Sequence, residues 1–66
     1  MNIIINGNIK EFKNQVTLGN VLEQLSLVGK VMAAAVNMDI VKQDKWDEYI
    51  LQENDKVELL DFVGGG

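Results

Sequence analysis

Residues 56–66 read KVELLDFVGGG, an apolar strand pattern that runs directly into three glycines. Side chains alternate between the two faces of a strand, so Val57 and Leu59 are expected to face the core, while Leu60 and Phe62 face outward. We expect this last strand, over residues 56–63, to lie in the centre of a sheet beside the first strand. The glycine tail then leaves from a rigid support.

The three glycines at 64–66 have no side chains that could pack against the rest of the protein. Glycine has no Cβ, and it loses more conformational freedom than any other residue when it is ordered. A glycine tail suits a task in which the backbone enters a narrow channel and presents a bare carboxylate. A frayed terminus and an expression scar are the alternative explanations of the same residues.

The first residues of the chain predict a β-hairpin. An apolar run at 3–5 and a second one at 9–12 flank the Asn-Gly pair at 6–7, which is a strong hairpin signal. A two-residue turn pairs Ile4 with Ile9, whereas a longer loop sets a different register. We favour the longer loop. The core residues expected with it are Ile3, Ile5 and Phe12.

One helix is predicted after the hairpin. Thr17 is a favourable N-cap, and Val16 and Val21 occupy the positions of a hydrophobic staple. The apolar residues that follow Thr17 recur at i, i+3, i+4 and i+7, the pattern of a helix with one buried face. They are Leu18, Val21, Leu22 and Leu25.

Shorter elements separate the helix from the last strand. Residues 31–36 predict a third strand, and residues 40–41 predict a short fourth strand after a turn at 37–39. Residues 42–48 are polar around Trp46. We expect Trp46 to close one end of the core rather than to bind a ligand, because no other aromatic residue accompanies it.

The order of these elements predicts an α+β fold, with one main helix packed on one face of a mixed sheet of four to five strands. With 66 residues the chain is a single domain, 1–66, in which 64–66 form a flexible tail. One helix cannot cover both faces of a sheet, so part of the second face must meet solvent or a partner. The residues expected to dock a partner are Leu60, Phe62 and Val63.

Composition narrows the function. The net charge is −4, which argues against nucleic-acid binding, because that requires a basic patch. A basic protein partner fits the charge better, although mild acidity also simply keeps a small protein soluble. No apolar run reaches the length of a membrane span, and no basic segment marks a signal peptide. We therefore expect a cytoplasmic protein.

No catalytic set is present in the sequence. Without His or Cys there is no Ser-His or Cys-His pair and no nitrogen or sulfur ligand for a metal. The carboxylates of Asp44, Asp47 and Glu48 near Trp46 are better explained as a solvated polar turn than as acid–base groups. The α-carboxylate of Gly66 remains, and it becomes reactive once it is activated, for instance as an acyl-adenylate. These features predict a substrate protein with no bound cofactor or metal, rather than a catalyst.

Taken together, the pieces resemble the β-grasp proteins that end in Gly-Gly: ubiquitin and its prokaryotic relatives, above all the ThiS family of sulfur carriers in thiamine biosynthesis. Two departures from that family are visible: Asn54, expected in a left-handed turn position, stands where Gly is frequent, and Lys42 stands where Pro is common. Local geometry tolerates both. The pieces that carry the resemblance are residues 3–7, Thr17, Ala35-Val36-Asn37, Ile40-Val41, Trp46, the 52–55 turn and Val63-Gly64-Gly65-Gly66.

The resemblance implies a reaction cycle. A ThiF-type enzyme uses ATP to adenylate the carboxylate of Gly66, and sulfur drawn from cysteine by a desulfurase then replaces AMP to leave a thiocarboxylate. A ThiG-type thiazole synthase takes that sulfur, while Gly64 and Gly65 thread the partner's active site. The free carrier is expected to be a monomer. Two rivals remain open: the small subunit of molybdopterin synthase, and a ubiquitin-like interaction module with an inert tail.

Overall fold

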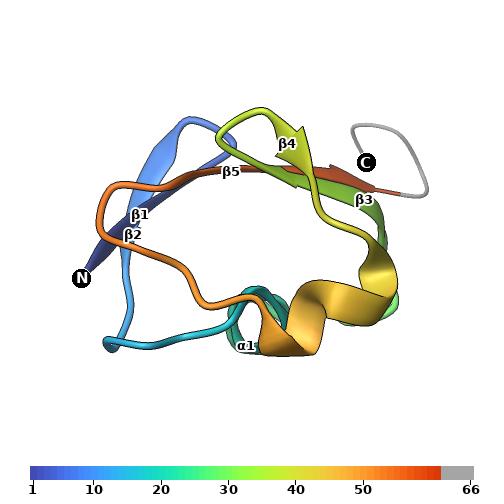
Figure 1. Cartoon of the computed structure of the whole chain (residues 1–66), viewed down its shortest axis with the longest axis horizontal. Helices are drawn as coiled ribbons and strands as arrows, with labels where there is room; N and C mark the ends of the chain where they lie inside the picture. Colours follow the sequence, from blue (N-terminus) through green and yellow to red (C-terminus); the bar gives the residue numbers. More distant parts are fainter. Residues whose placement is uncertain (62–66) are drawn as a thin grey trace.

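The computed structural model describes residues 1–61, so the expectations for Phe62, Val63 and the glycines at 64–66 lie outside the described residues. A five-stranded mixed sheet forms one layer, and two short helical elements form the other (Figure 1). The strands are β1 (Asn2–Ile5), β2 (Asn8–Glu11), β3 (Val31–Val36), β4 (Asp39–Ile40) and β5 (Lys56–Asp61). The second layer holds α1 (Leu18–Gln24) and the 3-10 helix η1 (Gln43–Glu48). The predicted α+β fold is confirmed.

The last strand lies in the middle of the sheet. The strand order is β2-β1-β5-β3-β4, with β5 parallel to β1 and antiparallel to β3. This confirms the expectation that the final strand runs beside the first. The short fourth strand is present as well, but it begins at Asp39 and ends at Ile40, one residue earlier than expected.

The hairpin register differs from the favoured one. Asn6 and Gly7 form a two-residue turn with φ values of 47° and 85°, and Ile4 lies opposite Ile9. The expected longer loop is therefore wrong. The expected core residues of this hairpin are nevertheless buried: Ile3, Ile5 and Phe12.

A two-residue turn is compatible with buried Ile3 and Ile5, because side chains alternate between the two faces of each strand. Ile4 and Ile9 lie opposite each other and share the outer face. Their neighbours Ile3 and Ile5 consequently face inward. Backbone pairing continues past the strand ends, where the Phe12 N–H donates to the Met1 carbonyl at 2.8 Å, so Phe12 returns to the inner face.

Helix α1 begins as its sequence predicts. The Thr17 hydroxyl accepts a hydrogen bond from the Asn20 N–H, and the Asn20 amide oxygen accepts one from the Thr17 N–H, both at 3.1 Å. This reciprocal pair is a capping box. The helix buries Leu18, Val21 and Leu22 against the sheet, and Leu25 at its end is half-buried.

Trp46 closes one end of the core, as expected. Its side chain is buried, and the indole N–H donates to the Val41 carbonyl at 2.8 Å. This bond satisfies the polar atom of an otherwise apolar side chain. Within residues 1–61, no helix has the length and apolar character needed to cross a membrane.

Candidate functional site

The inward and outward pattern of β5 agrees with the sequence as far as Asp61. Val57 is buried, Leu59 is half-buried, and Leu60 is 52% exposed. Leu60 therefore lies on the outer face of the sheet, near the point where the tail leaves. Phe62 and Val63, the other two expected docking residues, lie outside the described part of the chain.

The outer face beside Leu60 is shallow and apolar. Leu60 lies opposite Ala33, and Glu58 lies opposite Ala35, so methyl groups form the floor between the longer side chains. Ile40 on β4 is 74% exposed at the border of this floor. A depression of about 380 Å³ results, lined by residues that include Asn6, Ala33, Ala35, Ile40, Glu58 and Leu60.

A β-bulge on β3 produces this floor. The register between β3 and β5 shifts between Val31 and Ala33, which leaves Met32 as an extra residue opposite Asp61. The extra residue resets the alternation, so Val31 is buried while Ala33 faces outward. No sequence signal marked this bulge. It lies directly beside the last described residue of β5.

The tip of the hairpin contacts β5 through a side chain. The Leu59 N–H donates to the Asn6 Oδ1 at 2.8 Å, and the Asn6 Nδ2 donates to the Leu59 carbonyl at 3.3 Å. The sequence marked Asn6 as a turn residue but did not indicate a partner 53 residues away. No sequence signal could have found this contact, because it depends on how closely the two segments lie after folding.

The start of β5 is fixed by a second amide. Asn37 donates from Nδ2 to Asp55 Oδ1 at 2.9 Å and accepts a hydrogen bond from the Lys56 N–H at 3.0 Å. Asp55 Oδ2 accepts a hydrogen bond from the Gln52 N–H at 2.8 Å. Asp55 is only 9% exposed, so both of its oxygens are satisfied within the protein. The network joins the β3–β4 turn to the first residue of the central strand.

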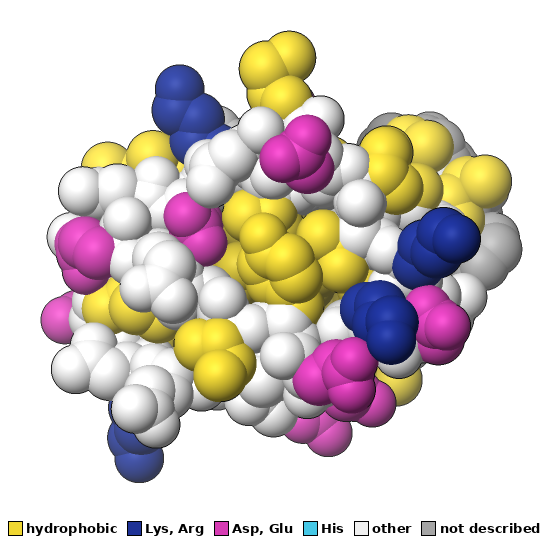
Figure 2. All heavy atoms as spheres, viewed as in Figure 1, with side chains coloured by type: hydrophobic (Ala, Val, Ile, Leu, Met, Phe, Trp, Pro, Cys, Tyr) yellow, Lys and Arg dark blue, Asp and Glu magenta, His cyan; other side chains and the backbone are white. Residues whose placement is uncertain are grey.

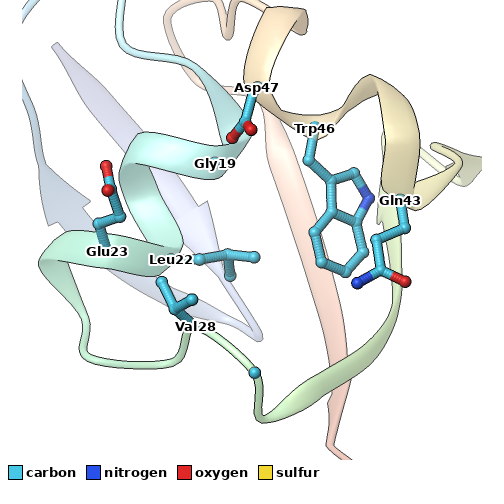
Figure 3. A pocket seen from close by; sticks show the side chains of 8 residues that line it. Gly19, Leu22, Glu23, Val28, Gln43, Trp46 and Asp47 are labelled. Atoms are coloured by element: carbon cyan, nitrogen blue, oxygen red, sulfur yellow. The ribbon is translucent and has the colours of Figure 1, made fainter.

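A second hollow, of about 300 Å³, lies between α1 and η1 (Figure 3). Leu22 points toward the indole of Trp46, and the Asp47 carboxylate lies against Gly19. A Cβ at Gly19 would lie 3.3 Å from Asp47 Cα, which is a tight contact with backbone, so the absence of a side chain allows α1 and η1 to approach closely. The geometry accounts for this glycine as a packing contact.

The carboxylates around Trp46 form a solvated surface. Asp44, Asp47 and Glu48 are all exposed, and Lys45 forms an exposed ion pair with Glu48 at 3.3 Å. Figure 2 shows the same mixture of basic and acidic side chains over η1. Among residues 1–61, no group of three or more potential ligand side chains is placed to hold a metal ion.

Known proteins resemble the chain along its whole length. The sulfur carrier protein ThiS of Escherichia coli strain K12 is 30% identical over 66 residues, which cover all of both chains. A thiazole synthase of Paramagnetospirillum magneticum is 29% identical over 66 residues, and here the chain spans only 20% of the relative's length.

A solved structure shows the same fold. The crystal structure of a thiamine biosynthesis protein (ThiS) from Geobacter metallireducens aligns over all of both chains with a TM-score of 0.82 and 24% sequence identity. The expected β-grasp architecture is thereby confirmed. A model of the ThiS family matches residues 3–66, and the chain therefore belongs to the ThiS family.

Proposed function

We propose that this chain is a sulfur carrier protein of thiamine biosynthesis. The observation that carries the proposal is the match to the ThiS family over residues 3–66, together with full-length similarity to a relative named sulfur carrier protein ThiS. In this role the chain is a co-substrate of other enzymes and not a catalyst. The molecule is expected to work in the cytoplasm.

The reactive group in this proposal is the α-carboxylate of Gly66. One of its oxygens attacks the α-phosphorus of ATP in a ThiF-type enzyme, which forms an acyl-adenylate and releases pyrophosphate. The terminal sulfur of a persulfide, which a desulfurase forms from cysteine, then attacks the acyl carbon, and AMP leaves. A thiol reductant cleaves the resulting acyl disulfide, which leaves a terminal thiocarboxylate on the carrier and a disulfide on the donor side. ATP is bound by the adenylating enzyme, and the carrier itself needs no cofactor.

The proposed acceptor of the sulfur is a ThiG-type thiazole synthase. The similarity to one fifth of a relative named thiazole synthase supports this partner, because the same domain there belongs to a longer chain of that name. Gly64 and Gly65 would thread the partner's active site, since a glycine backbone is the narrowest that a chain can offer. Leu60, Phe62 and Val63 would contact the partner's surface beside the channel.

The body of the protein suits this task. The strand that leads to the tail is held on both sides, by β1 and by β3, so the tail is presented from a fixed origin. An exposed apolar side chain, Leu60, lies close to that origin. A partner can therefore bind the sheet and receive the tail in one encounter.

The first prediction concerns the length of the tail. Incubated with ATP and its adenylating enzyme, the protein should gain AMP at Gly66 and, with a sulfur donor, exchange one oxygen for sulfur. Removing Gly66, or adding one residue after it, should abolish both products. The terminal carboxylate then lies short of the reacting phosphorus or beyond it, and is no longer in position to attack. Intact-mass spectrometry measures each product, and thermal melting checks that the fold persists.

Three results would contradict the proposed function. One is normal sulfur loading of the truncated protein. Another is that expression of the chain complements a molybdopterin defect but not a thiamine defect, which would move the carrier to the other pathway. The third is a tail that acquires neither AMP nor sulfur, which would favour an interaction module.

A further inference from the structure

The backbone pairing between β1 and β5 is short. The Ile4 N–H donates to the Asp55 carbonyl and the Asn6 N–H to the Val57 carbonyl, both at 2.9 Å. At Asn6 the chain turns back into β2, so the backbone of β1 makes no further pairing with β5 after Val57. The part of β5 that leads to the tail continues beyond this point.

The side chain of Asn6 continues the pairing where the backbone of β1 stops. Its amide offers one acceptor and one donor, and these meet the N–H and the carbonyl of Leu59 at 2.8 and 3.3 Å. A primary amide carries a carbonyl oxygen and an NH₂ group, so it can accept and donate one hydrogen bond each, as a peptide unit does. The Asn6 side chain thus extends the hydrogen bonding between β1 and β5 to Leu59, two residues closer to the tail than Val57.

Asparagine fits this position for two reasons. The turn requires a positive φ at residue 6, which Asn tolerates better than most residues. Both hydrogen bonds to Leu59 are exposed, so water competes for each group and their net contribution to stability is small. The pair instead fixes the orientation of the Leu59 peptide groups about the strand axis, because both hydrogen bonds go to the same residue.

The opposite edge of β5 is held differently. There β3 pairs as far as Asp61, through the bulge at Met32. Bulges bend a strand and increase its local twist. The amide of Asn6 on one side and the bulge on the other therefore act on the same short segment, from Leu59 to Asp61.

We propose that Asn6 is a positioning residue for the carboxyl-terminal tail: its amide fixes the direction in which β5 delivers the tail to a partner's active site. The proposal rests on the proposed role of Gly66 as the reacting group. Asn6 itself would touch neither ATP nor sulfur. It acts through Leu59, and the consequence appears at the tail.

The test compares two variants, each of which removes side-chain hydrogen bonds at a different end of β5. Asn6→Gly removes the amide at the tail end and keeps the positive φ of the turn. Asn37→Gly is the matched control, because Asn37 also has positive φ and also makes two amide hydrogen bonds, but to Asp55 and to Lys56 at the start of the strand. All measurements are made at a temperature at which both variants are fully folded.

We expect Asn37→Gly to affect stability more than Asn6→Gly, and Asn6→Gly to affect adenylation more than Asn37→Gly. Asn37→Gly should lower the melting temperature more, because it leaves a buried oxygen of Asp55 without a partner. Asn6→Gly should leave the melting temperature nearly unchanged, but lower kcat for adenylation by roughly tenfold to a hundredfold with little change in KM. Backbone ¹⁵N order parameters of Leu60 and Asp61 should fall in Asn6→Gly, from about 0.85 toward about 0.6, and stay unchanged in Asn37→Gly.

Two results would overturn the role of Asn6. One is an unchanged order parameter at Leu60 and Asp61 in Asn6→Gly. The other is a loss of kcat in Asn37→Gly as large as that in Asn6→Gly, which would show a general effect of stability. If the wild-type protein is not adenylated at all, the proposed function fails, and the order parameters alone then decide whether Asn6 directs the strand.

Discussion

Several side chains hold the central strand at both of its ends. The amide of Asn37 and the carboxylate of Asp55 meet at the start of β5, and the amide of Asn6 meets Leu59 near its end. The buried group among them is Asp55, whose two oxygens accept bonds from the Asn37 amide and the Gln52 N–H. Its neighbours would lose their acceptor if it were removed, so its effect on stability should exceed that of an exposed acid.

Asp55→Ala should lower the free energy of unfolding by about 1–3 kcal/mol, because two part-buried hydrogen bonds to a carboxylate are lost. In a domain of this size each kcal/mol lowers the melting temperature by roughly 4–8 °C. Asp39→Ala is the control, since Asp39 is exposed and the charge change is the same. Equal melting temperatures for the two variants would show that the Asp55 network contributes nothing measurable.

At the scale of the elements, the helix and most strands could be predicted from local patterns. Leu18, Val21 and Leu22 recur with helical spacing and are buried, and Thr17 caps the helix as its type suggests. The predicted hairpin register is wrong because a two-residue turn is compatible with inward Ile3 and Ile5: the pair Ile4 and Ile9 takes the outer face, and the neighbours of Ile4 then face the core. The bulge at β3 left no local trace, because Met32 resembles its neighbours in hydropathy.

The site was predictable to a smaller extent. The outward direction of Leu60 followed from simple alternation along the last strand and is confirmed by its exposure. The contact between Asn6 and Leu59 could not be derived, since it depends on how far apart two segments lie after folding. The predicted roles of Phe62, Val63 and the glycines remain predictions, because they concern residues outside the described part.

The capping box is the feature of α1 most open to test. The helix has seven residues, too few to be stable alone, so its first turn depends on the cap and on packing. Thr17→Ala should cost about 1 kcal/mol of stability, because the Asn20 N–H loses its acceptor. Thr17→Ser keeps the hydroxyl and should cost much less. Chemical denaturation of both variants measures the difference, and identical midpoints would argue against the cap.

At the scale of the whole molecule, the sheet has one covered face and one open face. α1 and η1 both lie on the same side of the sheet (Figure 1), and the core forms between the two layers. On the other face Leu60, Ile40 and Ile9 are each more than half exposed. Of these, Leu60 lies on the strand that carries the tail, which makes it the side chain best placed to meet a partner.

Leu60→Ala should leave the melting temperature nearly unchanged and weaken binding to the adenylating enzyme or to thiazole synthase by roughly tenfold to a hundredfold, because a buried Leu contributes about 1.5–3 kcal/mol. Binding should also weaken with salt, since Glu58 and Asp61 flank Leu60. Ile9→Ala is the control, as Ile9 is exposed on the same face but on the edge strand β2. Calorimetric titration of both variants measures the affinities. A loss of affinity in Ile9→Ala alone, or a large loss of stability in Leu60→Ala, would contradict a docking role for Leu60.

The central position of the last strand has a consequence for the synthesis of the protein. Because β5 separates β1 from β3, a nascent chain that stops before residue 56 cannot close its sheet. Such a product stays open to proteases, whereas a completed chain becomes protected. A folded body that lacked the tail would occupy the partner enzymes as a dead-end competitor. Because the final strand lies in the middle of the sheet, a chain that stops before residue 56 gives a degradable fragment and not an inhibitor of the partner enzymes.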